Sequence, residues 1–223
     1  KKKYLMSWIN KDTEIYCSFA KKAGNTGCQM MNSAFYYYGL NKIYKSFSVD
    51  NIKDAVNAVK TLNIKGFAIT MPYKKEVLNY VDEIDTSAKV GAANTVINDK
   101  GKLKAHNTDY LAALEYLSYY KNKDYKDWDK FYILGNGGYA LAVKAAAKEL
   151  DMEFIEVNRD NWSILPTINH CLIYNCTPVE NLDYLHKNNH FINCIVTSES
   201  GHALATLQAS YQFKLYTGLK FPY

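Results

Sequence analysis

The sequence predicts an α/β protein composed of two successive α/β units. Through the first half of the chain, short β-rich segments alternate with segments whose apolar residues recur at helical spacing, which is typical of strands connected by helices. A polar stretch at residues 121–129 follows. After it, a buried-strand pattern at residues 131–134 precedes a glycine-rich turn and an alanine-rich segment that ends at Leu150. The alternation therefore begins again, which indicates a second unit.

The elements of the first unit follow from periodicity and turn residues. Residues 51–62 have the spacing of a helix with one apolar face, and Ile43, Lys45 and Phe47 alternate along a strand at residues 43–49. Asp99-Lys100-Gly101 is a turn sequence typical of a β-hairpin between strands at residues 95–98 and 103–106. We also expect strands at residues 14–18 and 66–70 and helices at residues 29–38 and 76–81. Strands alternating with helices predict a mostly parallel sheet.

Composition excludes several classes of protein. The 223 residues are 48% hydrophobic and 22% charged, as in ordinary soluble domains. The net charge of +5 comes from lysines interspersed with acids, which argues against a nucleic-acid-binding surface. No apolar run approaches the roughly 20 residues of a membrane span, and Asn10-Lys11-Asp12 interrupts any signal sequence after the first lysines. We therefore expect a cytoplasmic protein, or one that has lost a targeting segment, with neither nucleic-acid nor membrane partners.

Cysteine and histidine spacings give no metal motif. The chain has five cysteines without a C-x-x-C pair, and none of its five histidines lies in an H-E-x-x-H arrangement. We expect reduced thiols and no metal site.

Three short segments lie at the ends of predicted strands and carry polar groups in apolar surroundings, at residues 70–74, 91–95 and 107–109. Lys74 and Asp109 belong to the first and last of them. If the fold brings these strand ends together, a lysine and an aspartate could move a proton on and off an alcohol. Taken singly, Lys74 could be a solvated lysine at a helix start, and Asp109 could be an N-cap.

The glycine-rich turn predicts a dinucleotide site. Its sequence fits G-x-G-x-x-G/A between a strand and a helix, with a further strand predicted at residues 153–157. The helix N-terminus would offer free N–H groups to the pyrophosphate, although a Gly-Gly pair can also be an ordinary loop. The expected cofactor-binding residues here are Gly135, Asn136, Gly137, Gly138, Tyr139 and Ala140.

Asn158-Arg159 follows the next strand, where the adenosine ribose lies in dinucleotide folds. Arg159 is the only arginine in the chain, and a guanidinium binds phosphate in a bidentate manner. A cation here favours the 2′-phosphate of NADP, whereas Glu156 could favour NAD. An ordinary surface arginine is the alternative.

In these segments the chain resembles the shikimate dehydrogenase family, whose sequences read T-x-P-x-K, G-A-x-N-T and N-T-D in this order. The resemblance is strong over residues 66–120 and weaker elsewhere. The family's S-x-S pair is absent, and Gly24-Asn25-Thr26-Gly27 resembles the G-N-x-G loop of the divergent shikimate dehydrogenase-like branch. The segment at residues 195–200 is shorter than the corresponding segment of the family's sequences. The resemblance therefore implies that a strand and a helix that would enclose the nicotinamide are missing.

The resemblance implies roles for individual residues. Lys74 and Asp109 would be the catalytic pair, Asn158 and Arg159 would bind NADP with the glycine-rich turn, and Gly201 would lie near the nicotinamide. The residues implied to bind the substrate are Ser18, Asn25, Thr70, Asn94 and Gln208.

The resemblance also implies an architecture and an activity. A substrate domain at residues 1–110, completed by a C-terminal helix at 202–223, would pack against a shortened Rossmann-type NADP-binding domain at residues 111–201. The protein would be an oxidoreductase of the chorismate pathway of aromatic amino acid biosynthesis, reversibly reducing 3-dehydroshikimate or a related cyclic keto acid with NADPH. The alternatives are a dehydrogenase of quinate or another hydroxy acid, and a catalytically weak ligand-binding homologue. The partner is a small-molecule substrate, and we expect a monomer or a homodimer.

Overall fold

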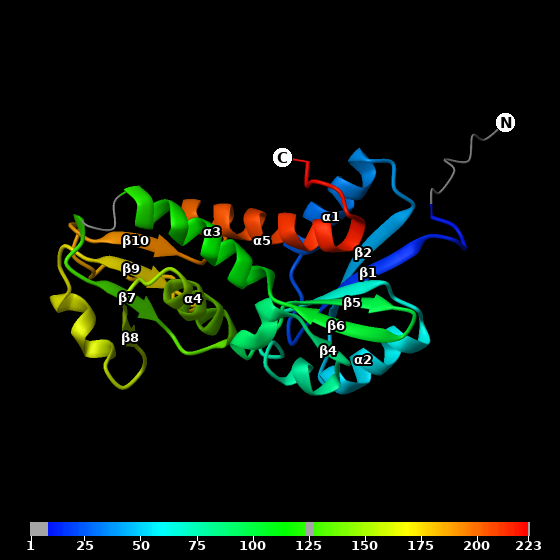
Figure 1. The fold of residues 1–223 in the computed structure, drawn as a ribbon, viewed down its shortest axis with the longest axis horizontal. Helices are drawn as coiled ribbons and strands as arrows, with labels where there is room; N and C mark the ends of the chain where they lie inside the picture. The colour runs from blue at the N-terminus through cyan, green and yellow to red at the C-terminus, as the bar shows by residue number, and fades with distance from the viewer. Residues whose placement is uncertain (1–8, 124–126, 223) are drawn as a thin grey trace.

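Two α/β units lie side by side along the long axis of the molecule (Figure 1). The computed structural model describes residues 9–123 and 127–222. Two long helices, α3 (Thr108–Lys123) and α5 (Glu199–Thr217), connect the units. The predicted two-unit α/β architecture is confirmed. The domain ranges 1–110, 111–201 and 202–223 stay a prediction, and parts of them, like part of the polar stretch at 121–129, lie outside the described residues.

The first unit contains a six-stranded sheet in the order β2-β1-β3-β5-β6-β4. β1, β2, β3, β4 and β6 run in one direction, and β5 is antiparallel to its neighbours β3 and β6, so the sheet is mostly parallel, as predicted, with one reversed strand. The predicted hairpin explains the reversal, because Lys100 and Gly101 have φ of 52° and 92°, as a tight two-residue turn requires. The strands are β1 (Glu14–Ala20), β2 (Lys42–Ser48), β3 (Gly66–Ile69), β4 (Glu83–Ile84), β5 (Thr95–Asp99) and β6 (Lys102–His106).

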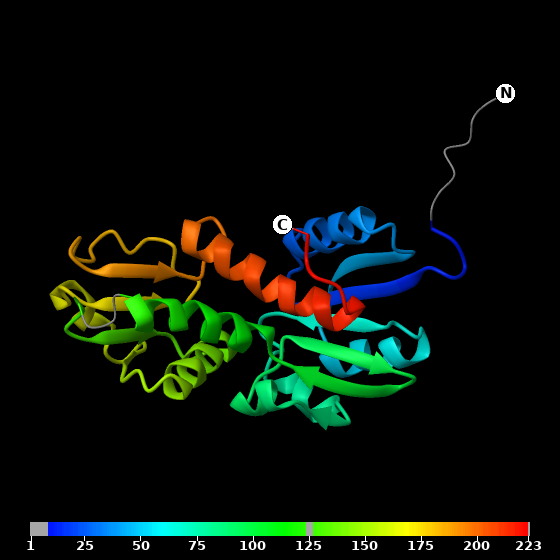
Figure 2. The same ribbon diagram turned by 45° about the horizontal axis from the view of Figure 1, so that its top comes forward.

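Helices cover both faces of this sheet (Figure 2). α2 (Ile52–Thr61) buries its predicted apolar face against Phe67 and its neighbours, and the Asn51 side chain caps it by accepting from the Asp54 N–H at 3.2 Å. α1 (Thr26–Tyr37) packs on the opposite face together with α5. The short helix predicted at residues 76–81 is a 3₁₀ helix, Glu76–Tyr80, and a second one spans Thr86–Val90.

The second unit is a parallel four-stranded sheet in the order β10-β9-β7-β8. The chain leaves β7 toward β8 and returns on the other side to β9. This creates a topological switch point at the carboxyl ends of the strands, where ligands bind in such folds. The elements are β7 (Phe131–Leu134), α4 (Gly138–Glu149), β8 (Ile155–Val157), a 3₁₀ helix (Trp162–Thr167), β9 (Leu172–Asn175) and β10 (His190–Asn193).

β10 leads directly into α5, with residues 194–198 as the only connection. The helix begins at Glu199, three residues before the predicted start at residue 202, because the Ser198 side chain accepts from the Gly201 N–H at 3.0 Å. Within residues 9–123 and 127–222, no helix has both the length and the apolar character to cross a membrane.

Candidate active site

A cleft of about 320 Å³ lies between the two units, and its walls come from both. The first sheet contributes the ends of β1, β2 and β3, the glycine-rich turn contributes Tyr139, and α5 crosses the opening with Leu204 and Gln208. Predicted site residues that line the cleft are Ser18, Thr70, Lys74, Asn94, Asp109, Tyr139 and Gln208.

Lys74 and Asp109 form an ion pair inside this cleft. The Lys74 Nζ lies 2.5 Å from the Asp109 Oδ2, and the two side chains are only 17% and 8% exposed. Lys74 follows β3 after a turn, and Asp109 lies in the first turn of α3, where the helix dipole favours a carboxylate. The N-cap alternative for Asp109 is wrong, because Asn107 caps this helix by accepting from the Tyr110 N–H at 2.9 Å.

Asn94 and Gln208 are held beside this pair by a buried amide network. The Asn94 Nδ2 donates to the Thr108 Oγ1 at 2.9 Å and to the Gln208 Oε1 at 3.3 Å, while the Asn94 Oδ1 accepts from the Thr108 N–H at 2.7 Å. The network joins Asn94, which immediately precedes β5, to α3 and α5, and these segments are distant in sequence. It fixes two side-chain amide groups at the wall of the cleft, where they can form hydrogen bonds with the hydroxyl groups of a ligand.

The far wall of the cleft is a cluster of hydroxyls. The Ser18 Oγ on β1 lies 2.9 Å from the Ser46 Oγ on β2, and Ser46 also contacts the Cys28 Sγ at 3.1 Å. Tyr44 and Thr26 extend this wall. The sequence interpretation missed Ser46 and Tyr44. The available signal was that alternate residues of a strand share a face, so Tyr44 and Ser46 lie opposite to Lys45 and Phe47.

Two predicted substrate-binding residues are less enclosed. Thr70 is exposed at the end of β3 but lines the cleft. Asn25 is exposed, precedes α1 without a side-chain cap, and is not among the cleft-lining residues, although its neighbours Gly24 and Thr26 are.

The glycine-rich turn packs directly against Lys74. A Cβ at Gly138 would lie 2.9 Å from the Lys74 Cβ, so only glycine fits without displacing the lysine. The Lys74 Nζ lies 5.5 Å from the centroid of the Tyr139 ring. Burial raises the pKa of Tyr139, whose hydroxyl lies 2.9 Å from that of Tyr174. Burial likewise raises the pKa of the cleft-lining Cys194 to about 11, so both groups are neutral at pH 7.

The same turn fits a pyrophosphate. Gly135 has φ of 107° and packs against Thr177, whereas a Cβ at Gly137 would meet nothing within 4 Å. Gly137 precedes α4 without a side-chain cap, so the first N–H groups of the helix remain available. Ala140 is buried and allows close packing of the helix, and Asn136 lies in the same turn.

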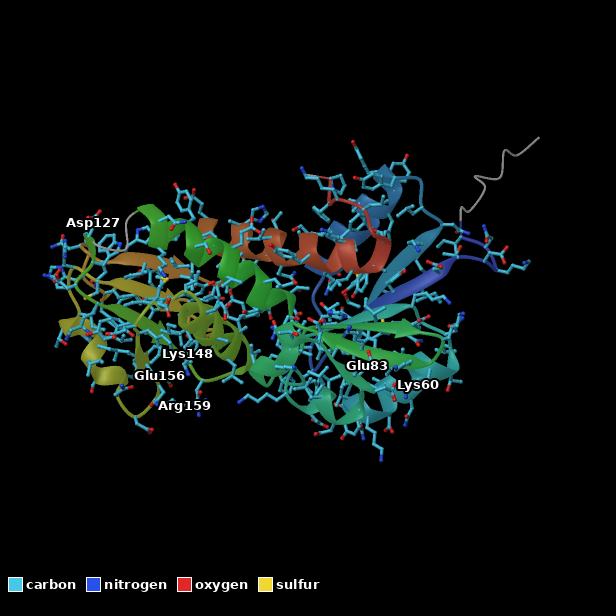
Figure 3. The ribbon with its side chains drawn as sticks, viewed as in Figure 1. Lys60, Glu83, Asp127, Lys148, Glu156 and Arg159 are labelled. Atoms are coloured by element: carbon cyan, nitrogen blue, oxygen red, sulfur yellow. The ribbon has the colours of Figure 1, made fainter. Side chains whose placement is uncertain are left out.

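The ribose end of the predicted site is open and carries charge (Figure 3). Arg159 is exposed just beyond β8 and makes no ion pair with any residue that the structure describes. The Asn158 side chain accepts from the Asp160 N–H at 2.8 Å and shapes this turn. The Glu156 carboxylate lies 2.7 Å from the Lys144 Nζ.

Gly201 has a packing role in the structure. It lies in the first turn of α5, and a Cβ there would overlap the Ile195 carbonyl oxygen. It does not line the cleft, so its expected place near a nicotinamide stays a prediction. Among residues 9–123 and 127–222, no group of three histidine, cysteine or acidic side chains could hold a metal ion.

Comparison with known proteins points to one family. The family model for the shikimate dehydrogenase substrate binding domain matches residues 26–96. The chain is 37% identical over 155 residues to a shikimate dehydrogenase-like protein of Haemophilus influenzae, covering 69% of this chain and 56% of that protein. It is 39% identical over 145 residues to a shikimate dehydrogenase (NADP(+)) of Pyrococcus furiosus, covering 64% and 51%. The chain thus spans about half the length of these curated relatives.

Solved structures resemble the whole chain. A shikimate 5-dehydrogenase-like protein superimposes with a TM-score of 0.80 at 28% identity, covering 96% of this chain and 95% of that one. A shikimate dehydrogenase solved in complex with NADP+ gives a TM-score of 0.71 at 25% identity, covering 95% and 92%. The Rossmann-type fold of the second unit is therefore confirmed.

Proposed function

We propose that the chain, which is similar to shikimate dehydrogenases in sequence and in fold, is an NADP-dependent oxidoreductase acting on a 3-dehydroshikimate-like cyclic keto acid. The observation that carries this proposal is the enclosed Lys74–Asp109 pair, which shares one cleft with the glycine-rich turn. A proton donor and a dinucleotide-binding turn in one cleft suit the reversible reduction of a ketone.

Lys74 and Asp109 divide the proton chemistry. When bound, the nicotinamide cofactor supplies or accepts the hydride. In the reducing direction the Lys74 ammonium gives its proton to the carbonyl oxygen, and in the oxidising direction the neutral amine removes the hydroxyl proton. The Asp109 carboxylate, 2.5 Å from the Lys74 Nζ, orients the ammonium toward the substrate.

Neutral groups hold the rest of the substrate. Lys74 is the only cationic residue among the described residues that line the cleft, so a substrate carboxylate must be bound by neutral donors. Ser18 and Ser46 supply hydroxyls on the far wall, where they replace the missing S-x-S pair. Asn94 and Gln208 hold ring hydroxyls, because a site built on hydrogen bonds rejects analogues that lack them.

The residues around the glycine-rich turn suit NADP. The open space at Gly137 and the uncapped start of α4 would hold the pyrophosphate, and Arg159, free of ion pairs with the described residues, would bind the 2′-phosphate. We therefore assign NADP as the cofactor.

A second candidate is a ligand-binding homologue with weak activity. The observation that favours it is the direct passage from β10 into α5, which leaves fewer elements to enclose a nicotinamide. Quinate or another hydroxy acid is the alternative substrate, because the hydroxyl wall differs from an S-x-S pair.

One experiment separates these possibilities. NADPH absorbance is followed with purified protein against 3-dehydroshikimate, and NADP+ reduction against shikimate, quinate and related hydroxy acids. The proposal predicts turnover with at least one of these acids. A ligand-binding protein would raise its melting temperature with ligand yet turn over no cofactor, which would refute the enzymatic proposal.

A further inference from the structure

Lys144 is a buried lysine that has no part in the proposed chemistry. It lies on the inner face of α4, its side chain is 7% exposed, and the helix around it is rich in alanine. Its Nζ lies 2.7 Å from the Glu156 Oε2 and 3.4 Å from the Asn136 Oδ1. One ammonium group therefore joins the glycine-rich turn to the end of β8.

Glu156 occupies a sensitive place for a dinucleotide. It lies next to the last residue of β8, its side chain is half exposed, and Asn158-Arg159 follows at once. In Figure 3, Glu156 and Arg159 lie at the same edge of the second unit. An acid at the end of this strand hydrogen-bonds the ribose hydroxyls of NAD, and its negative charge would repel a 2′-phosphate.

We propose that Lys144 is a positioning residue for cofactor selectivity, which neutralises Glu156 so that Arg159 can bind a 2′-phosphate beside it. The inference rests on the proposed function, because it assumes that a dinucleotide binds at the glycine-rich turn. Lys144 does not touch the cofactor in this scheme, and its effect passes through the Glu156 carboxylate. The pair thereby turns an acid that would suit NAD into one compatible with NADP.

The alternative is an ion pair that only supports the fold. Removing the partner of a buried charge such as the Lys144 ammonium leaves that charge uncompensated and destabilises the protein, whatever the function of the pair. Loss of stability alone therefore cannot separate the two roles. A change in the ratio of NADP to NAD affinity can, because a supporting role affects both cofactors alike.

The test is a set of calorimetric titrations of NADP+ and NAD+ into the parent, Lys144→Met, Glu156→Gln and the double variant, each with its melting temperature. Lys148→Met is the matched control, because Lys148 is exposed one turn further along α4. We expect Lys144→Met to weaken NADP+ about tenfold, or about 1.4 kcal/mol, with NAD+ changed less than about threefold. The double variant should return NADP+ affinity to within about threefold of the parent, and Lys148→Met should leave both affinities unchanged.

Three outcomes would overturn the proposal. Equal losses for both cofactors in Lys144→Met, or no recovery in the double variant, would show that the pair only supports the fold. If Lys144→Met does not fold, the Glu156→Gln variant alone provides the test. The proposal requires this variant to bind NADP+ at least as tightly as the parent, and a lower affinity for NADP+ would contradict the proposal. A parent protein that binds neither cofactor would refute the proposed function itself, whereas equal losses from a binding parent refute only the role of Lys144.

Discussion

Replacing Lys74 with methionine should slow turnover severely while leaving a folded protein. Methionine keeps the length of the side chain and removes the ammonium group, so the cleft keeps its shape and loses its proton donor. A positioned proton donor contributes about 10²–10⁴-fold to the rate of a reaction, so kcat should fall by that factor. The affinity for the cofactor should change little, because proton transfer is used only in the transition state.

The same substitution should also lower stability by an amount that the geometry bounds. Asp109 is 8% exposed and would lose its partner at 2.5 Å, and breaking a fully buried pair costs about 3–5 kcal/mol. The cost here should be smaller, about 1–3 kcal/mol, because the cleft admits water and the α3 N-terminus offsets about 0.3–1 kcal/mol. Urea unfolding measures this difference, and the Lys74→Met/Asp109→Asn double variant should recover part of the stability but none of the turnover.

Lys75→Met is the matched control for this prediction. Lys75 is the next residue and is exposed, so the same chemical change there should leave both kcat and stability near the parent values. The assay is NADPH absorbance with the best acid of the substrate panel, together with calorimetric binding of NADP+. Near-parent turnover of Lys74→Met would refute the role of Lys74 in proton transfer and would leave it only the role of an ion-pair partner of Asp109.

Four further predictions follow from the site. Arg159→Ala should weaken NADP+ roughly tenfold to hundredfold and spare NAD+ in calorimetric titrations, because only NADP carries the 2′-phosphate. Gly138→Ala should lower kcat about tenfold or more, since its Cβ would displace the Lys74 Cβ from 2.9 Å; unchanged kinetics would show that the turn can move. Ser46→Ala should raise KM about fivefold with kcat preserved, as expected for one lost hydrogen bond of about 1 kcal/mol. Burial lowers the pKa of His106, so the unfolded chain binds a proton at this residue more readily than the folded chain does. The free energy of unfolding should therefore fall as pH drops below about 6.5. His106→Gln should weaken this pH dependence, as measured by urea unfolding.

The meeting of Lys74 and Asp109 was predictable because both follow strand ends in an α/β pattern. Such ends gather at one edge of a sheet, and short sequence patterns identify which ends carry polar groups. What the pattern could not assign was the cap of α3. Asn107 and Asp109 are both good N-cap residues, and only the backbone conformation decides that Asn107 accepts from the Tyr110 N–H.

The hydroxyl wall and Lys144 were not predictable for a different reason. The period of two in β2 separates Ser46 from Phe47 but does not say which face is covered, and the cover comes from α1 and from α5 at the other end of the chain. A lysine within an alanine-rich helix indicates an exposed position by composition alone. Its burial depends on Glu156, which a separate strand brings to 2.7 Å from it.

α5 explains why the two units act as one site. Leu204, near its start, packs into the core of the second unit, whereas Phe213, near its end, packs into the core of the first. Gln208 lies between these two anchors and reaches the Asn94 amide at the wall of the cleft. A helix anchored at both ends resists a change in the angle between the units, because any rotation must break apolar packing at one of them. The Gln208 amide, which contacts the substrate in the proposed function, is therefore fixed by the same helix that sets the width of the cleft. A substitution in either core should lower stability and, because it shifts Gln208, should also alter KM.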